Sequence, residues 1–270
     1  MQTRQVDHLI TAADTLLETG KLTEHREGRP PTERPFEIRL LGPEHLDEVC
    51  ETQQRIVETL MDPEFYHPNP RELIGMSLGE HGKGIGTFVD GALVGFRLIL
   101  FPGARADNLG RDIGLPTHCL DSVAHLERTG VDPVYRGNRL QIRMTAHAVR
   151  LIVKNHRWRH IFSTVAPANF ASMQDKFRIG MQIVRTLKKY GDCWRHVFYL
   201  DLSEPVGIDP ETIVAVAAGD LVAQHSLVEE RGYIGFALAK PGVAPVVLYA
   251  WPSRPVGRCC LSIATRDGGH

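Results

Sequence analysis

Apolar positions along the chain switch between a period of two and a period near 3.6, which predicts a mixture of strands and helices. Residues 36–41 alternate as a strand, and Pro43 then opens an amphipathic helix. The dipeptide Asp90-Gly91 separates the apolar runs 85–89 and 92–100, the strongest short-range signal of a hairpin. The first half of the chain therefore begins as strand, helix and hairpin.

The second half alternates strands with helices. A short helix is predicted over 70–78, before the hairpin. Beyond the hairpin the pattern predicts helices over 138–155 and 169–179 and strands over 120–131, 161–165, 182–187 and 197–202. Residues 102–118 contain glycines and prolines without periodicity and predict a long loop, which in a compact domain is often functional. The element order indicates an α/β or α+β fold with a mixed sheet and crossover helices.

The pattern at both ends of the chain predicts segments outside this main domain. We expect an amphipathic helix over residues 6–22 and a charged, proline-rich linker over 24–35. The predicted organisation is an N-terminal arm and linker, a main domain, a C-terminal helix–hairpin extension with its helix over 213–231, and a tail: residues 1–35, 36–203, 204–251 and 252–270.

The 270 residues are 43% hydrophobic and 23% charged, with 31 Lys and Arg against 32 Asp and Glu, so the net charge is -1. This balance argues against nucleic acid or an acidic membrane surface as a partner. No apolar stretch approaches the roughly 20 residues of a membrane span, and the N-terminus does not resemble a secretory leader, so we expect a cytoplasmic protein. His156 and His160 lack a third ligand nearby, and no metal is expected.

The segment Val131-Asp-Pro-Val-Tyr-Arg-Gly-Asn-Arg-Leu-Gln141 joins a predicted strand to a predicted helix. Such a turn directs backbone N–H groups and the positive end of the helix dipole toward one point. Gly137 allows close approach of a ligand to the backbone, and Arg136 and Arg139 add positive charge. Physical reasoning alone leaves two interpretations open, a site for a phosphate-bearing ligand and an ordinary turn with surface arginines.

Three stretches together resemble the GNAT superfamily of acyl-CoA-dependent N-acyltransferases, most closely its bacterial members of undefined substrate. Residues 87–96 resemble the central hairpin of that family, residues 131–141 resemble its pyrophosphate loop V-x-P-x-Y-R-G-x-G-L-G, and residues 164–181 resemble its N-x-x-A/S-(x)7-G-F segment. The three occur in the order and at the spacing of the family. The resemblance implies a GNAT-like mixed, mostly antiparallel central sheet with crossover helices.

The resemblance also implies roles for individual residues. Thr129 and Val131 would pair with the pantetheine arm and present an N–H to the thioester carbonyl. Asn169 and Ser172 would face the far side of the cofactor. The pyrophosphate would be wrapped by Arg136, Gly137, Asn138, Arg139, Leu140 and Gln141.

This chain departs from the family pattern at two places. Arg139 and Gln141 replace glycines of the pyrophosphate loop, although arginine still suits an anion. The tyrosine that often serves as general acid falls at Lys176, with Phe177 beside it. A tyrosine acid is therefore not expected, and Lys176 stands at the catalytic position instead.

Acyl transfer to an amine needs a base, because an alkyl amine with a pKa of about 10 is mostly protonated at pH 7. Glu127 is the first candidate, and Asp121 and His125 are alternatives, since period-two alternation puts all three on one strand face. We expect that face to border a cleft. The other interpretation is a solvated strand end, with Glu127 paired to Arg128 or Arg143.

The expected function is transfer of an acetyl or other acyl group from acyl-CoA to the primary amine of a small-molecule acceptor. The loop 102–118 and the segment 62–71 would shape the acceptor pocket, and a charged acceptor would meet Arg97, Arg105, Asp107 or Asp112. Two alternatives stay open: a longer acyl donor on CoA or on an acyl carrier protein, and a binding module that holds acyl-CoA without turnover. The oligomeric state is left open, with a homodimer as one option.

Overall fold

We analysed a computed structural model of the chain, which describes residues 15–59, 68–240, 242 and 244–256. The backbone divides into two compact units, and each is described by itself. Unit 1 comprises Met1–Phe101 and Leu126–Asn155, and unit 2 comprises Pro102–His125 and His156–His270. Within the described residues, no helix is both long and apolar enough to cross a membrane.

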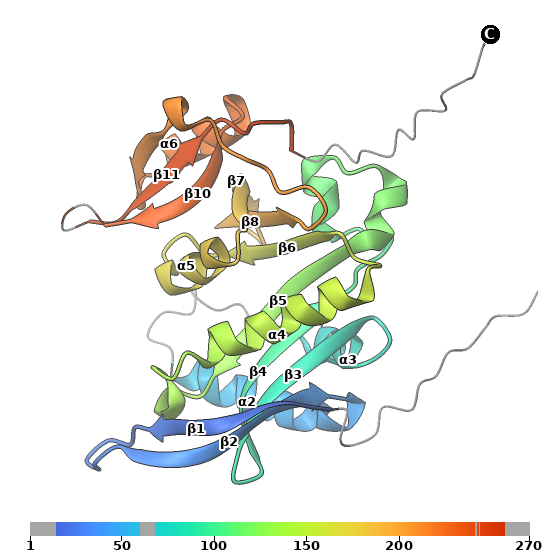
Figure 1. Cartoon of the computed structure of the whole chain (residues 1–270), viewed down its shortest axis with the longest axis vertical. Coiled ribbons are helices and arrows are strands. Elements are labelled where there is room, and N and C mark those ends of the chain that lie inside the picture. The colour runs from blue at the N-terminus through green and yellow to red at the C-terminus, as the bar shows by residue number, and fades with distance from the viewer. Residues whose placement is uncertain (1–14, 60–67, 241, 243, 257–270) are drawn as a thin grey trace, which may run out of the picture. The chain divides into compact units, whose positions relative to one another are not determined.

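The sheet of unit 1 follows the chain order of its strands (Figure 1). Its members are β1 (Leu16–Glu24), β2 (Thr32–Leu41), β3 (Gly82–Val89), β4 (Ala92–Leu100) and the second part of β5 (Val123–Val131). β1, β2, β3 and β4 pair successively in antiparallel fashion. The predicted hairpin is confirmed: Asp90 and Gly91 both have positive φ, 49° and 81°, as a tight two-residue turn requires.

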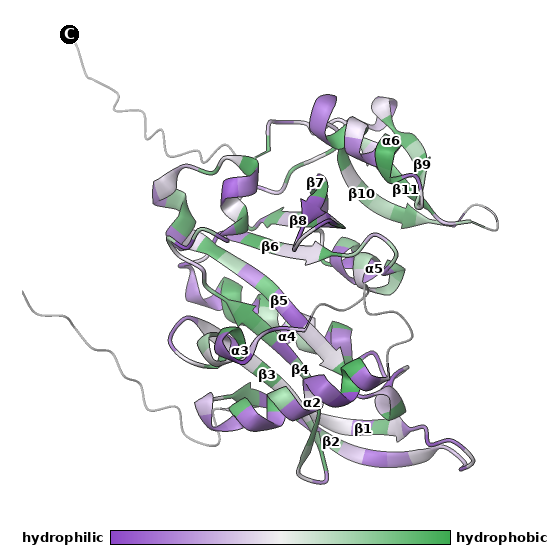
Figure 2. Ribbon diagram, turned by 180° about the vertical axis from the view of Figure 1, so that it is seen from behind, coloured by the Kyte–Doolittle hydropathy of each residue, from purple (hydrophilic) through white to green (hydrophobic). Residues whose placement is uncertain are grey.

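Helices cover both faces of this sheet. Viewed from opposite sides, α4 lies over one face and α2 with α3 over the other (Figures 1 and 2). Their bounds are α2 (Leu46–Glu58), preceded by a 3-10 turn η1 (Pro43–His45), α3 (Arg71–Leu78) and α4 (Leu140–Asn155). β4 is hydrophobic nearly throughout, since α2 and α4 bury it from both sides (Figure 2). The core between the sheet, α2 and α3 contains Val49, Ile56, Ile74, Leu78, Phe96 and Leu98.

The helix predicted over residues 6–22 is wrong where the structure describes it, because Leu16–Glu24 forms strand β1. Residues 6–14 of that prediction lie outside the described residues. Gly20 disfavours a helix here, because glycine costs about 1 kcal/mol inside one. In the strand, a Cβ at position 20 would lie 2.9 Å from the ring of Phe36, so glycine lets β1 pack against β2.

Unit 2 contains a second set of paired strands. In spatial order they are the start of β5, β6 (His160–Val165), β8 (Cys193–Asp201), β7 (Gln182–Lys189), β10 (Ile234–Ala239), β11 (Val246–Ala250) and β9 (Val214–Ala217). β5 and β6 pair in parallel, Val123–His125 against His160–Phe162. The pairs of β6, β7, β8, β9, β10 and β11 are antiparallel. The predicted mixed, mostly antiparallel sheet is confirmed.

Unit 2 also contains α5 (Phe170–Arg178), α6 (Leu221–His225), a π-helical turn η7 (Ser226–Glu230) and the 3-10 turns η3 (Leu109–Ile113), η4 (Thr117–Ser122) and η6 (Pro210–Thr212). The single helix predicted over 213–231 is wrong in its first part, which forms strand β9 against β11. Gly219 precedes Asp220, whose side chain accepts a hydrogen bond from the Ala223 amide and starts α6 there.

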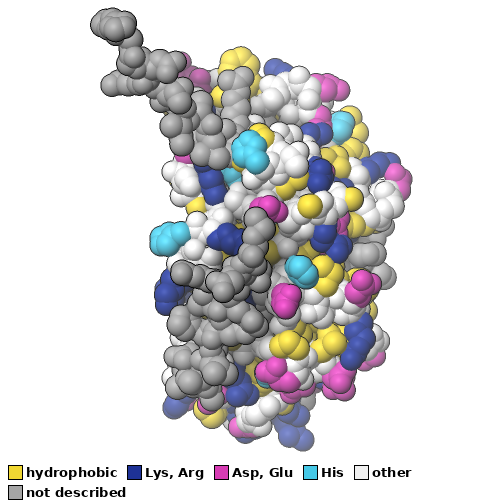
Figure 3. Space-filling view, turned by 90° about the vertical axis from the view of Figure 1, so that its right-hand side faces the viewer, with side chains coloured by type: hydrophobic (Ala, Val, Ile, Leu, Met, Phe, Trp, Pro, Cys, Tyr) yellow, Lys and Arg dark blue, Asp and Glu magenta, His cyan; other side chains and the backbone are white. Residues whose placement is uncertain are grey.

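The segment 102–118 is a connection rich in short 3-10 turns, and its apolar side chains pack inward. Leu109 and Leu115 join Leu120, Phe162 and Val197 in the core of unit 2. On the molecular face that Figure 3 presents, acidic and basic side chains are interspersed, in keeping with the near-zero net charge.

Candidate functional site

The turn between β5 and α4 is built from a short 3-10 segment and two left-handed residues. The Asp132 amide donates to the Val94 carbonyl at 2.8 Å, and the Asp132 carboxylate accepts from the Val134 amide at 3.1 Å. These bonds start the 3-10 turn η5 (Pro133–Tyr135). Gly137 and Arg139 then have φ of 86° and 57°. Backbone that alternates in this way directs successive N–H groups to one side, an arrangement that binds anions.

The first turn of α4 presents unpaired backbone donors. Its first hydrogen bond runs from the Arg143 amide to the Arg139 carbonyl at 3.0 Å, so the amides of Leu140, Gln141 and Ile142 have no acceptor within the helix. The helix has 16 residues, long enough for its dipole to favour a negative charge at this end. The side-chain nitrogen of Gln141 is buried and lacks a hydrogen-bond partner among the described residues. The free amides and the dipole at this end of α4 together favour an anion.

Arg139 stands where the loop pattern that this sequence resembles has glycine, and it has the backbone conformation that glycine adopts easily, with φ of 57°. A left-handed conformation costs a non-glycine residue about 1–2 kcal/mol. Arg136, in contrast, lies in extended backbone at φ -63° and ψ 160°, where any residue fits. Both arginine side chains are exposed, so the turn carries two positive charges accessible to a ligand.

The side chain of Asn138 points away from solvent and fastens the turn to β1. Its Oδ1 accepts from the Thr23 amide at 2.7 Å, and its Nδ2 donates to the carbonyls of Thr23 at 2.7 Å and Tyr135 at 3.0 Å. The side chain is therefore fully engaged within the protein. What Asn138 can offer a ligand is its backbone.

On β5, the side chain of Thr129 is also engaged, because its hydroxyl donates to the Phe96 carbonyl of β4 at 3.0 Å. Thr129 and Val131 are half-buried. As with Asn138, a contact between Thr129 and a bound chain would have to use the backbone.

The three candidate bases do not share one strand face. Asp121 is exposed and belongs to the 3-10 turn η4, because the strand begins at Val123 and not at residue 120 as predicted. His125 is buried, and its Nε2 accepts from the Leu109 amide at 3.1 Å. Glu127 is half-buried on β5. The expected polar face is therefore wrong at Asp121, and His125 supports the segment that contains η3.

In unit 2, three candidate residues belong to α5: Asn169 at its N-terminus, and Ser172 and Lys176 within the helix. Asn169 caps this helix, its Oδ1 accepting from the Ser172 amide at 3.0 Å. Lys176 lies on the same helix with 2% of its surface exposed. The capping bond explains an asparagine at position 169 by local structure, and a cofactor contact by Asn169 or Ser172 remains a prediction.

The charged residues suggested for acceptor recognition all have partners within the protein. Arg105 donates two hydrogen bonds to Asp107, at 2.9 and 2.8 Å, and Lys189 donates to Asp112 at 2.6 Å. Arg97 is buried and donates to the Thr145 hydroxyl at 2.5 Å. Within the described residues, no group of three or more His, Cys, Asp or Glu is positioned to hold a metal ion.

Comparisons with known proteins identify the fold. No protein-family model matches the sequence, and no curated protein matches it. Among solved structures, a GNAT-family acetyltransferase from Streptococcus pneumoniae matches 62% of this chain and 99% of its own, with 15% identity and a TM-score of 0.48. NAA60 of Arabidopsis thaliana, solved with acetyl-CoA, matches 63% of this chain and 99% of its own, with 15% identity and a TM-score of 0.50. The chain has the GNAT fold.

The predicted resemblance to GNAT proteins is thus confirmed at the level of fold. The sequence analysis nevertheless missed three residues that support the turn, Glu18, Glu24 and Tyr135. Glu18 accepts from Arg143 at 2.8 Å and lies 2.8 Å from Nε2 of His147, both on α4, and Glu24 accepts from the Tyr135 hydroxyl at 3.1 Å. Glu18 and Glu24 lie more than 100 positions before their partners in the chain, and no local sequence pattern predicts such contacts.

Both carboxylates have lowered pKa values. Burial raises the pKa of Glu18, but hydrogen bonds from His147 and Arg143 outweigh it and hold that pKa below its ordinary value. The hydrogen bond from Arg26 lowers the pKa of Glu24, and the bond from Tyr135 adds to the effect. The contacts of β1 with α4 and the turn therefore involve ionised carboxylates at neutral pH, where charge-assisted hydrogen bonds are strong.

Proposed function

We propose that this protein transfers an acyl group, acetyl in the simplest case, from acyl-CoA to the primary amine of a small-molecule acceptor. The observation that carries the proposal is the start of α4. Three backbone amides without helical acceptors follow the left-handed Arg139, in a chain with the GNAT fold. Backbone amides and a helix dipole directed at one point suit the negative charges of a pyrophosphate.

In this proposal the donor occupies the turn and the adjoining part of β5. The backbone of Gly137, Arg139, Leu140 and Gln141 donates to the pyrophosphate, while the side chains of Arg136 and Arg139 neutralise its charge. The backbone of Thr129 and Val131 pairs with the pantetheine arm. A backbone N–H of β5 would stabilise the oxyanion, an effect worth about 3 kcal/mol per donor in other enzymes.

Glu127 is our proposed general base. Asp121 lies outside the strand, and His125 would have to release the Leu109 amide before its Nε2 accepted a proton. Glu127 removes a proton from the attacking ammonium or amine, the amine nitrogen bonds to the thioester carbon, and the carbon–sulfur bond breaks. The departing thiolate belongs to a thiol with a pKa of about 8.5, so a strong acid is not essential.

The first experiment is thermal unfolding of the full chain with acetyl-CoA, free CoA and longer acyl-CoAs. A ligand present at 100 times its Kd adds about 2.7 kcal/mol of stability, which raises Tm by several degrees. We expect a shift with acetyl-CoA, followed by thiol release when a panel of small amines is added. A shift that grows with chain length would instead favour the longer-acyl donor.

A charge-reversed variant distinguishes this site from binding elsewhere. Gln141→Glu puts a negative charge in the first turn of α4, where it repels the pyrophosphate, and should abolish the shift. Gln174→Glu makes the same change at an exposed position on α5 and should leave the shift unaltered. The proposal fails if no CoA species raises Tm, or if Gln141→Glu responds as the wild type does.

The second candidate is a module that binds acyl-CoA without turnover. The buried Lys176, at the position where a tyrosine acid often stands in proteins that this chain resembles, favours it. This candidate predicts a CoA-dependent rise in Tm that survives Glu127→Ala, with no thiol release beyond spontaneous hydrolysis for any amine of the panel.

A further inference from the structure

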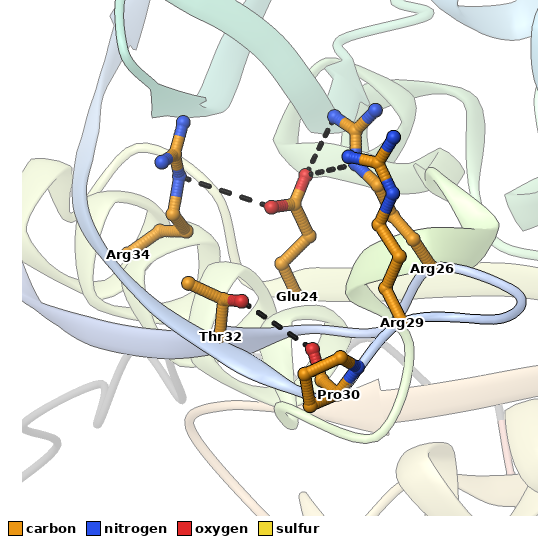
Figure 4. A pocket seen from close by; sticks show the side chains of 6 residues that line it. All are labelled: Glu24, Arg26, Arg29, Pro30, Thr32 and Arg34. Carbon is orange, nitrogen blue, oxygen red and sulfur yellow. Dashed lines mark hydrogen bonds and ion pairs between the residues drawn. The ribbon is translucent and has the colours of Figure 1, made fainter.

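A pocket of about 270 Å³ lies where β1 turns into β2, within unit 1. Its walls contain three arginines and one glutamate (Figure 4). The lining residues are Glu24, Arg26, Arg29, Pro30, Thr32 and Arg34. Nothing in the GNAT motifs of the sequence involves this hairpin, so the pocket is a feature of the segment that precedes them.

The positive charges of this arginine pocket are not fully compensated. Arg26 donates to Glu24 at 2.8 Å, and Arg34 is paired with Asp90 while its Nε lies 3.9 Å from Glu24. That Nε is buried and makes no hydrogen bond within the described residues. Arg29 also lines the pocket and makes no side-chain hydrogen bond or ion pair with another described residue. The pocket therefore holds one unpaired guanidinium and one buried, unsatisfied donor.

The arginine pocket adjoins the turn that precedes α4. Glu24, in the pocket wall, accepts from the hydroxyl of Tyr135, two residues before Gly137. The amide of His25 donates to the carbonyl of Val134 at 2.7 Å. The hairpin that forms the pocket is thus bonded to the same turn that carries the candidate pyrophosphate site.

We infer that the arginine pocket binds the 3'-phosphate monoester at the nucleotide end of the CoA donor, an inference that rests on the proposed function. A phosphate monoester carries close to two negative charges and three acceptor oxygens, and guanidinium groups match it in charge and in geometry. In CoA this group is attached to the ribose that follows the pyrophosphate. A donor whose pyrophosphate lies on residues 136–141 extends next to whatever borders that turn, which here includes the hairpin.

The test compares CoA with 3'-dephospho-CoA by titration calorimetry on the full chain. We expect the wild type to bind CoA about tenfold more tightly than 3'-dephospho-CoA, with the difference shrinking at 0.5 M salt. Arg29→Ala removes a guanidinium that holds no partner, so the fold should be retained. In this variant the preference should fall to about twofold, while the affinity for 3'-dephospho-CoA stays at its wild-type value.

Arg150→Ala is the matched control, since it removes one exposed arginine from α4 and should leave the tenfold preference intact. Arg29→Lys should restore part of the preference, because it restores the charge without the planar fork. If the wild type binds both ligands equally, or if Arg29→Ala weakens both by the same factor, the pocket inference is overturned and the proposed function stands. If neither ligand binds the wild type, both fail.

Discussion

Arg139 shows how a single residue keeps the backbone of a motif while changing its side chain. Its φ of 57° is a conformation that favours glycine. The strained backbone therefore carries a charged side chain, which is exposed on the same turn as that of Arg136. The arginine at position 139 is visible in the sequence, whereas its left-handed conformation is visible only in the structure.

The conformation leads to a paired prediction. Arg139→Gly removes the strain but adds chain entropy to the unfolded state. We expect the free energy of unfolding to rise by about 0.5–1 kcal/mol in total. Arg136→Gly, at φ -63°, adds the same entropy without relieving strain and should lose about 0.5–1 kcal/mol. Urea unfolding of both variants without ligand measures the difference. Equal effects would show that Arg139 is unstrained.

Glu127 provides the residue-scale test of the chemistry. Glu127→Gln keeps the shape of the side chain and removes its basicity, so we expect kcat to fall about 100-fold while the Kd for acetyl-CoA changes less than twofold. Glu127→Asp should recover part of the rate. A kcat unaffected by Glu127→Gln would exclude Glu127 as the base.

Some site residues were predictable from sequence and others were not. The turn residues from Arg136 to Gln141 follow from a local strand–turn–helix pattern, which a linear motif can carry. The engagement of Asn138 with Thr23, and of His125 with Leu109, depends on packing between segments distant in sequence. For this reason the side chains that are free for a ligand could not be separated beforehand from those used in the fold.

At the scale of elements, β1 is the strand that matters most among those predicted as helix, because it contacts both α4 and the turn before it. Leu16 and Leu17 fit a helical period as well as a strand, and the choice is decided by pairing with β2. Elements with strong local signals, such as the hairpin at Asp90-Gly91 and the helix α4, were predicted to within a few residues. The strand provides carboxylates for α4 and walls for the arginine pocket.

Glu18→Gln should loosen β1 from α4. The variant loses charge-assisted hydrogen bonds with Arg143 and His147, and we expect a loss of about 1–2 kcal/mol together with faster amide exchange over residues 16–24. Glu33→Gln is the control, because its exposed pair with Lys21 is worth little. Unchanged exchange in Glu18→Gln would show that β1 does not depend on these bonds.

At the scale of the whole molecule, buried histidines predict how stability responds to acid. Burial lowers the pKa of His160 to about 4 and that of His196 to about 3, from an ordinary value of 6.5. Below pH 6.5 these two histidines are therefore protonated in the unfolded chain while they remain neutral in the folded chain. The stability that these neutral rings contribute is complete above pH 6.5 and is lost as pH falls toward 4.

We expect the titration of His160 alone to lower the free energy of unfolding by about 2 kcal/mol between pH 7 and pH 5. His160→Gln should make the dependence of the unfolding free energy on pH shallower, whatever its effect at pH 7. His118→Gln, at an exposed position, should leave that dependence as in the wild type. Urea titrations at pH 7, 6 and 5 provide the comparison, and parallel curves for the wild type and His160→Gln would contradict it.

The central claim is that an acyl-CoA binds at the β5–α4 turn, and hydrogen exchange of the full chain with and without acetyl-CoA tests it most directly. The amides of Leu140, Gln141 and Ile142 lack helical acceptors, so in the free protein they should exchange quickly. Saturating acetyl-CoA should slow exchange in peptides that cover residues 129–142. If binding occurs and these peptides exchange at the same rate as before, the donor lies elsewhere and this account of the site is wrong.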